Sequence, residues 1–256
     1  MTTRFHTPAW TGALWLGDGW AAHRGAVGDS RAHAHHAHQI TASPAPLLVE
    51  IGDHVKRGTG FVIPSLQPHR LRPAAQALNI YVDATSRVGR RLTAWLGERP
   101  QRLSSTATAA LLALDPAAIS EGALLTCMEA MAEHEQETTL DPRLATVLDR
   151  LELAPGEPTP LRQLAEDVGL SEGRLSRLFA RQLGLAYRPY RKWRRLQHAF
   201  LLLGAGDNLT GAAVEAGFSD AAHLARTVRR LFGVTPSTVA TLLDAGQVRS
   251  RRGGRA

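Results

Sequence analysis

Apolar side chains recur with helical spacing in the last part of the chain. Leu224, Val228 and Leu231 lie at positions i, i+4 and i+7, which predicts one buried stripe along a helix. A run of small apolar residues before this stripe predicts a shorter helix. Gly217 lies between the two and can adopt the positive φ of a tight corner, and the pair Ser219-Asp220 offers capping oxygens to the longer helix. The pattern predicts two helices joined by a short glycine turn, a helix-turn-helix unit.

The same pattern occurs a second time upstream. An apolar run, Gly169 and a capping Ser171 lead into a helix that ends at Gly184, and the two corner glycines lie 48 residues apart. A period of this length also occurs in helical solenoids. With only two copies, and a distinct helix predicted over Tyr187–Leu203 between them, a tandem pair of helix-turn-helix units is favoured.

Helix signals also delimit the region around the two units. Asp141 is the predicted N-cap of a helix that runs to Leu153. Gly233 ends the last predicted helix, and Pro236 prevents its continuation. The joining helix carries basic residues that are expected to face outward, Arg191, Lys192, Arg194 and Arg195.

The first 90 residues show a different pattern. Short apolar runs such as Leu47–Val49, Phe61–Ile63 and Leu78–Val82 alternate with glycine and proline. This punctuation is typical of short strands joined by turns, and it predicts a β-sandwich or barrel.

Residues 91–137 return to helical spacing. Their apolar stripes are formed by Leu92, Trp95 and Leu96, and by Leu124, Met128 and Met131. Stripes of this kind are explained equally well by packing against the preceding strands and by pairing of two subunits.

The net charge is placed unevenly. Residues 1–140 carry 12 Lys/Arg and 12 Asp/Glu, whereas residues 141–256 carry 18 and 11, so the whole formal charge of +7 lies in the second half. This distribution predicts a module that binds a polyanion, attached to a module with another task. The last residues, 246–256, are basic and glycine-rich and are expected to form a disordered tail.

Composition narrows the class of protein. The single cysteine, Cys127, excludes an internal disulfide framework and a metal site built from several cysteines. No stretch reaches the apolar length of a membrane span, and the N-terminus lacks the apolar run of a signal peptide. A cytoplasmic protein that does not associate with a membrane is therefore expected.

Residues 216–236, in the second helix-turn-helix pattern, resemble a known family. The run Ala216–Asp220, with His223-Leu224 and Arg226 after it and Phe232–Pro236 at the end, is similar to the signature of the AraC/XylS family of bacterial transcription regulators. The likeness is strong over 141–245 and weaker in the N-terminal part. It implies a DNA-binding regulator, commonly an activator that acts on RNA polymerase, with a cupin-like sensing barrel and a helical segment that often pairs two subunits.

The expected architecture is an α+β multidomain fold, with a short cupin-like β-barrel, a helical linker and an all-α C-terminal domain that holds two helix-turn-helix units. The predicted divisions are a sensing domain over 1–90, a linker over 91–137, the DNA-binding domain over 141–245 and the tail.

Matching positions in the family pattern imply which side chains contact double-stranded DNA. Arginine can make a bidentate contact to guanine, and alanine can touch a thymine methyl group. The base-contact candidates are Ser176, Arg177, Ala222, His223 and Arg226. The phosphate candidates, which give register and salt-dependent affinity, are Arg174, Arg181, Arg194, Arg195, Arg229 and Arg230.

A group of histidines in the N-terminal part carries a second candidate chemistry. If the run from His33 lies on a strand, His33 and His35 share one face, while His36 and His38 share the other. In a barrel, His69 could join the first pair, and three imidazoles with an open position suit Zn²⁺, Fe²⁺ or Ni²⁺.

The resemblance to metal-binding cupins is imperfect at this site. Gly58, Pro64 and His69 look like the second cupin motif, but Gln39 stands where those proteins usually carry glutamate, and Leu66 stands where they usually carry glycine. The alternatives are a pocket for an organic effector lined by histidines, a pH-responsive pocket, or solvated imidazoles near a strand end.

Two other classes of function compete with a regulator. A cupin-type metal-dependent enzyme with an attached DNA-binding module needs the histidine triad and an acid or base beside it, and no Ser-His-Asp arrangement, phosphate loop or HExxH motif occurs. A non-specific nucleoid protein would bind all DNA equally. The chain is expected to be a sequence-specific regulator and not an enzyme.

Overall fold

The computed structural model describes residues 9–97, 99–129, 140–153 and 157–244. The predicted tail over 246–256, the end of the predicted linker over 130–137 and Met131 lie outside the described residues. The chain divides into two compact units, one formed by residues 1–135 with 228–256 and the other by 136–227. Each unit is described by itself.

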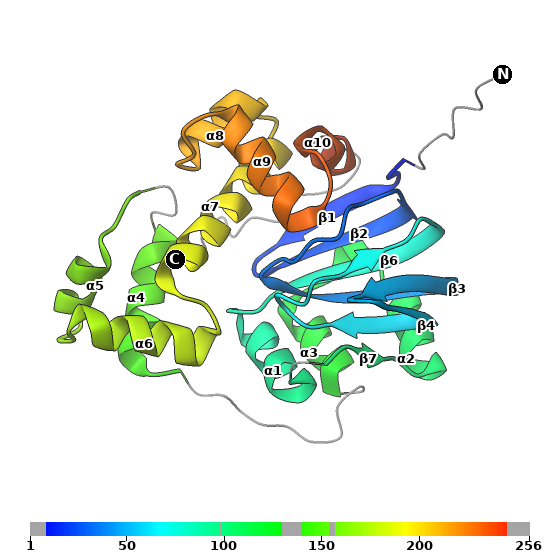
Figure 1. The fold of residues 1–256 in the computed structure, drawn as a ribbon, viewed down its shortest axis with the longest axis horizontal. Helices are drawn as coiled ribbons and strands as arrows, with labels where there is room; N and C mark the ends of the chain where they lie inside the picture. Colours follow the sequence, from blue (N-terminus) through cyan, green and yellow to red (C-terminus); the bar gives the residue numbers. More distant parts are fainter. Residues whose placement is uncertain (1–8, 98, 130–139, 154–156, 245–256) are drawn as a thin grey trace. The chain divides into compact units, whose positions relative to one another are not determined.

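The first unit is built on one antiparallel sheet (Figure 1), and the short apolar runs lie in its strands, as predicted. Its strands pair in the order β1-β2-β6-β3-β4-β7, and β5 pairs with β3. The strands are β1 (Ala13–Gly17), β2 (Trp20–Val27), β3 (Ala37–Ile51), β4 (His54–Ile63), β5 (Arg70–Leu71), β6 (Ala74–Asp83) and β7 (Gln101–Arg102).

Strand register assigns the side chains to the two faces of this sheet. Ile40 pairs with Val62 on one side and with Ile80 on the other, so these three side chains point to the same face. The neighbouring row, in which Thr41 lies opposite Asn79, points to the other face. Both faces have a buried apolar cluster, so the sheet is covered on both sides over part of its length.

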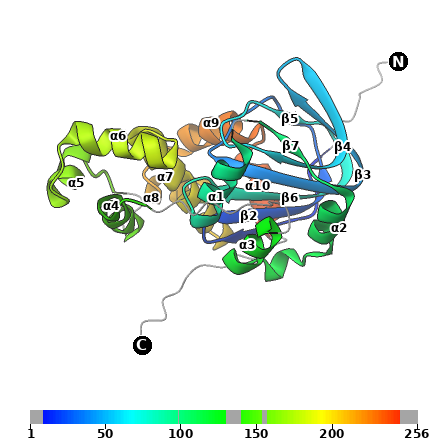
Figure 2. The ribbon, with the colours of Figure 1, turned by 90° about the horizontal axis from the view of Figure 1, so that it is seen from below.

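Helices cover the face that carries Ile40. They are α1 (Arg87–Leu96), α2 (Ser105–Ala113), the 3-10 turn η1 (Pro116–Ala118) and α3 (Glu121–Glu129), and they lie along one side of the sheet (Figures 1 and 2). Leu92, Leu124 and Met128 are buried in one cluster with the strands. The leucine stripes therefore pack against the sheet, and the half-buried Cys127 lies beside the same cluster.

The second unit is helical, as expected. Its helices are α4 (Pro142–Leu153), α5 (Leu161–Asp167), α6 (Glu172–Leu183), α7 (Tyr187–Gly204), α8 (Leu209–Glu215) and the first residues of α9 (Ala221–Phe232). Asp141 caps α4 by accepting a hydrogen bond from the backbone N–H of Arg143 at 2.9 Å. In the described part of the chain, no helix has the length and apolar character that a bilayer crossing needs.

The sequence did not predict the last helix, α10 (Pro236–Asp244). Gly233 does end α9, with a φ of 69°. Pro236 then begins a new helix, because its fixed φ and missing N–H suit the first turn. This helix packs against β1 and belongs to the first unit.

Candidate DNA interface and histidine cluster

The first helix-turn-helix is formed by α5 and α6. Gly169 takes a φ of 66° at the corner, a backbone conformation that costs other residues about 1–2 kcal/mol. The Ser171 hydroxyl accepts a long hydrogen bond of 3.4 Å from the backbone N–H of Arg174 and caps α6. Leu175 and Phe179 are buried, which leaves the opposite side of α6 exposed.

The second helix-turn-helix is formed by α8 and α9. Gly217 takes a φ of 80° at the corner. The Asp220 carboxylate accepts a hydrogen bond of 2.6 Å from the backbone N–H of His223, and this bond lowers the pKa of Asp220. Leu224 and Val228 are buried, as their spacing predicts. The two corners therefore have the same construction.

Arginines occupy equivalent places on the two longer helices. Arg177 is the sixth residue of α6, and Arg226 is the sixth residue of α9. Both side chains are exposed. Of the other candidates on these helices, Ser176 and His223 are half-buried, and the remaining ones are exposed, namely Arg174, Arg181, Ala222, Arg229 and Arg230.

The joining helix α7 differs from the expectation at one position. Arg191 was expected to face outward, but it is only 6% exposed, and it shares a helix face with the buried Tyr187 one turn earlier. Arg194 and Arg195 are half-buried. Arg194 lies 3.6 Å from the Glu152 carboxylate and donates a hydrogen bond to Gln197 at 3.2 Å. Its predicted phosphate contact would therefore compete with these partners.

The structure brings the three predicted histidines of the first unit together. The ligand atoms of His33, His35 and His69 lie within 4.8 Å of one another. The local backbone differs from the expectation, because β3 begins at Ala37, after His33 and His35. His33 instead forms an isolated bridge with His69, with N···O distances of 3.0 and 2.9 Å.

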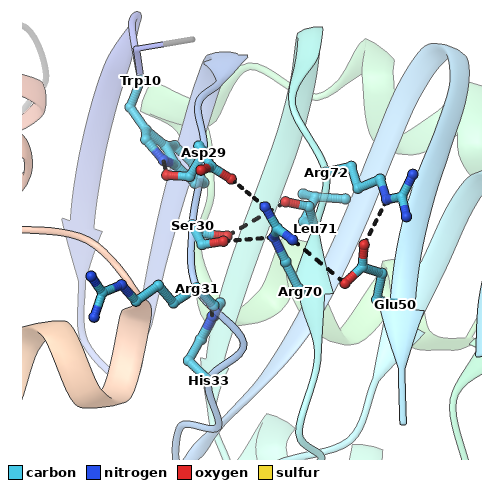
Figure 3. Close-up of polar contacts among 9 residues, drawn as sticks. All are labelled: Trp10, Asp29, Ser30, Arg31, His33, Glu50, Arg70, Leu71 and Arg72. Atoms are coloured by element: carbon cyan, nitrogen blue, oxygen red, sulfur yellow. Dashed lines mark hydrogen bonds and ion pairs between the residues drawn. The ribbon is translucent and has the colours of Figure 1, made fainter. Parts of the chain in front are cut away.

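A polar network fixes the segment that carries His33 (Figure 3). Arg70 on β5 forms an ion pair of 2.7 Å with Asp29 and donates a hydrogen bond of 2.8 Å to the Ser30 carbonyl. Glu50 on β3 forms an ion pair with Arg72, with 2.6 Å between Glu50 Oε1 and Arg72 Nε. The contacts of Arg70 attach Asp29 and Ser30 to β5, and His69 directly precedes that strand.

Each ring of the triad is oriented by a backbone carbonyl. Nδ1 of His33 lies 2.8 Å from the carbonyl oxygen of Arg31. The same distance separates Nδ1 of His35 from the Ala37 carbonyl oxygen, and Nδ1 of His69 from the Gln67 carbonyl oxygen. Burial lowers the pKa of all three imidazoles, most of all that of His35, and brings that of His69 to about 4. The three rings are therefore neutral at neutral pH.

Sequence reasoning singled out Gln39 but missed two residues behind the triad, Asn79 and His23. The Gln39 oxygen Oε1 lies 3.0 Å from Nε2 of His69 and 3.3 Å from Nε2 of His35. Gln39 Nε2 donates to Asn79 Oδ1 at 3.2 Å, and Asn79 Nδ2 lies 3.3 Å from His23 Nδ1. The side chains in this network are at most 2% exposed, namely His23, His35, Gln39, His69 and Asn79. The signal for Asn79 and His23 was a polar residue within an apolar strand, but the sequence alone does not give the register that joins them.

Comparisons with known proteins find relatives of the helical region. Residues 164–241 match the model of a family described as "Helix-turn-helix domain". An uncharacterized HTH-type transcriptional regulator of Staphylococcus aureus is 37% identical over 105 residues, which is 40% of this chain and 14% of that protein. The invasion protein InvF of Salmonella typhi is 32% identical over 85 residues, 33% of this chain and 39% of that protein. The chain thus spans about one seventh of the length of the first of these relatives.

Solved structures resemble the whole fold. The match to ToxT of Vibrio cholerae extends over 88% of this chain and 99% of the ToxT chain, with a TM-score of 0.58 and 8% identity. The match to ToxT with a bound unsaturated fatty acid extends over 89% of this chain and 98% of the ToxT chain, with a TM-score of 0.57 and 9% identity. At this identity the likeness shows the fold, a sheet domain joined to a helical domain. The family match and the two glycine corners show that this chain carries a helix-turn-helix domain.

Proposed function

We propose that this chain is a sequence-specific transcription regulator, and that α6 and α9 each enter a major groove of the operator. The observation that carries the proposal is the equivalence of Arg177 and Arg226, each exposed at the sixth position of a capped helix that follows a glycine corner. A guanidinium there can donate two hydrogen bonds to one guanine.

The other exposed arginines of these helices would contact phosphates. Arg181 and Arg230 are each the tenth residue of their helix and lie exposed, one turn beyond the base-contact candidates. Phosphate contacts supply affinity that falls with salt and carries no sequence information. Together the two sets would give a regulator both its attachment to DNA and its choice of site.

The first unit would sense the signal. We propose a small molecule or a metal ion as effector, activation through contact with RNA polymerase, and a homodimer as the working form; the resemblance to AraC/XylS regulators supports each of these. A chain that acts on the chromosome is expected in the cytoplasm. The fatty acid in the ToxT structure makes an amphipathic carboxylate a second class of effector to test.

The test is a binding selection on random duplexes with the purified chain. The proposal expects a defined motif, and binding to this motif that is at least 1,000-fold tighter than to scrambled DNA at physiological salt. Equal affinity for all duplexes would favour the non-specific nucleoid protein. Turnover of a small molecule without any selected motif would favour the metal-dependent enzyme, for which the relatives named above offer no support.

A further inference from the structure

We propose that Ser219 and Asp220 hold His223 in one tautomer, and that α9 thereby selects a base with an amino group, adenine or cytosine, on the strand that His223 faces. This choice of base rests on the proposed function, because it requires the first turn of α9 to enter the major groove. His223 is the third residue of that helix and is half-buried. In helix-turn-helix proteins, the first residues of the recognition helix are the ones that contact base edges.

The second corner contains a serine that its helix does not use as a cap. Before α6, the Ser171 hydroxyl accepts a hydrogen bond from the backbone N–H of Arg174 and caps the helix. Before α9, that role belongs to Asp220, whose Oδ1 accepts from the backbone N–H of His223 at 2.6 Å. The hydroxyl of Ser219, one residue earlier, is therefore available for other contacts.

The Ser219 hydroxyl joins the Asp220 carboxylate to the imidazole ring. Ser219 Oγ donates to Asp220 Oδ2 at 3.0 Å and lies 3.2 Å from Nδ1 of His223. The backbone N–H of His223 and the Ser219 hydroxyl lower the pKa of Asp220, so its carboxylate is ionised and only accepts hydrogen bonds. The single hydroxyl hydrogen therefore points to Asp220, where the bond is charge-assisted, and the Ser219 oxygen accepts from Nδ1.

The ring of His223 is held on a second side by Phe218. The two rings meet edge to face, with 5.2 Å between centroids and 81° between planes. Phe218 is only 5% exposed, so this contact is fixed by the packing of the helical unit. With Nδ1 bound to Ser219, the other ring nitrogen, Nε2, has no hydrogen-bond partner among the described residues. In a neutral ring it holds a lone pair.

An acceptor at Nε2 matches only some of the base edges in the major groove. Adenine N6 and cytosine N4 are amino donors there, whereas guanine N7 and O6 and thymine O4 are acceptors. The Nε2 lone pair attracts the two amino groups and repels the other groups. A ring with its hydrogen on Nε2 would have the opposite preference. Ser219 is therefore a positioning residue that decides which bases His223 accepts.

The equivalent place on α6 lacks this arrangement. The third residue of α6 is Arg174, and the hydroxyl before it is used as the cap. A guanidinium only donates hydrogen bonds, so α6 cannot favour an amino group at that place. The preference for an amino group is thus expected only in the part of the operator that α9 reads.

The first test measures the tautomer without DNA. Long-range proton–nitrogen correlation spectra of the full chain at about pH 8.5, above the range in which histidines usually titrate, distinguish the two neutral forms of the ring. The signals of His223 are those that disappear in His223→Ala. We expect a hydrogen on Nδ1 in the wild type and in Ser219→Thr, and a shift to the Nε2–H form in Ser219→Ala. An Nε2–H ring in the wild type, or no shift in Ser219→Ala, would overturn the proposal.

The second test locates the base pair and probes its amino group. The binding selection with His223→Ala should relax the motif at one pair only, by about 10-fold. At that pair the amino group is then removed, by purine in place of adenine or by the corresponding analogue of cytosine. The wild type should lose about 10-fold in affinity on this duplex, Ser219→Ala clearly less and His223→Ala nothing. Equal losses in the wild type and in His223→Ala would overturn recognition of the amino group.

The matched control is Ser237→Ala, which removes an exposed hydroxyl of α10 and should behave as the wild type in both tests. A selected motif that is the same in the wild type and in His223→Ala would overturn the proposal and leave the proposed function intact. Selection of no motif at all would overturn the proposed function, and the base preference with it, whatever the tautomer.

Discussion

The amide oxygen of Gln39 lies 3.0 Å from Nε2 of His69, an atom that carries a lone pair because its ring donates from Nδ1. In these tautomers no hydrogen lies between the two acceptors, which is costly for buried groups.

Metal binding should stabilise the first unit. A ligand that binds only the folded state adds about 2.7 kcal/mol at one hundred times its Kd. For a unit of this size, we expect Zn²⁺ to raise Tm by roughly 5–10 °C, and chelator to reverse the rise. Scanning calorimetry of the wild type and of His35→Ala/His69→Ala measures it. The same rise in both proteins would mean that the ion binds elsewhere.

Asn79 should act as a positioning residue. Replacing it by leucine removes the acceptor that orients Gln39 but leaves every proposed ligand in place. We expect metal affinity to fall about 10–100-fold, as for other changes behind metal ligands. Asn79→Asp retains an acceptor for Gln39 and should restore most of the affinity. Titration calorimetry measures both variants.

A control for this prediction lies in the same row of the sheet. Thr41 is buried opposite Asn79, and its hydroxyl has no hydrogen-bond partner among the described residues. Thr41→Val should leave metal affinity unchanged. If Thr41→Val weakens binding as much as Asn79→Leu, the effect is one of core packing and the orientation argument is wrong.

Stability in chelator should depend on pH through His38. Its Nδ1 accepts from the Ser65 N–H at 3.1 Å and its Nε2 lies 2.9 Å from the Thr93 hydroxyl, so the ring is held neutral. Burial lowers the pKa of His38 from 6.5 to about 4, although the Asp83 carboxylate opposes this shift. The unfolded chain therefore takes up the proton first as the pH falls.

The sign of this dependence is fixed by the lowered pKa. His38 has no effect above about pH 7, and it removes stability as the pH falls from 6.5 towards 4, by about 2 kcal/mol at pH 5. Urea unfolding at pH 7.5 and pH 5 measures the loss. In His38→Gln the loss should be smaller by that amount, and an identical loss would show that other groups cause it.

The corner glycine Gly169 should be needed for its φ and not for space. Nothing lies within 4 Å of a Cβ atom on Gly169, yet its φ of 66° is strained for alanine. Gly169→Ala should cost about 1–2 kcal/mol of stability. Gly173→Ala on α6, where the φ is ordinary and the nearest atom is 3.7 Å away, should gain about 0.5 kcal/mol. Equal effects of the two changes in chemical unfolding would contradict this account.

The helix-turn-helix units could be predicted because their signals are local. A glycine at the corner, a cap within three residues and an apolar stripe determine α8 and α9 whatever the rest of the chain does. Arg191 could not be placed in this way. Its burial depends on how α7 packs against its neighbours, and α7 carries basic and aromatic residues around most of its surface.

The histidine site shows the same limit. Alternation predicts that Gln39 and Thr41 share a face, but the register of β3 against β6 decides that Asn79 lies near them. That register joins residues about 40 positions apart. The grouping of His33, His35 and His69 followed from the likeness to a cupin motif, whereas the buried chain that ends at His23 required the structure.

The central claim is that exposed side chains of α9 read bases, and the most direct test compares Arg226→Ala with Arg229→Ala on the selected duplex and on duplexes changed at single positions. Arg226→Ala should lose about 1–3 kcal/mol on the selected site and relax the preference at one base pair. Arg229→Ala should weaken binding equally on all duplexes and reduce the salt slope by about one. If both variants lose affinity uniformly on every sequence, α9 contacts only phosphates and the account of sequence recognition is wrong.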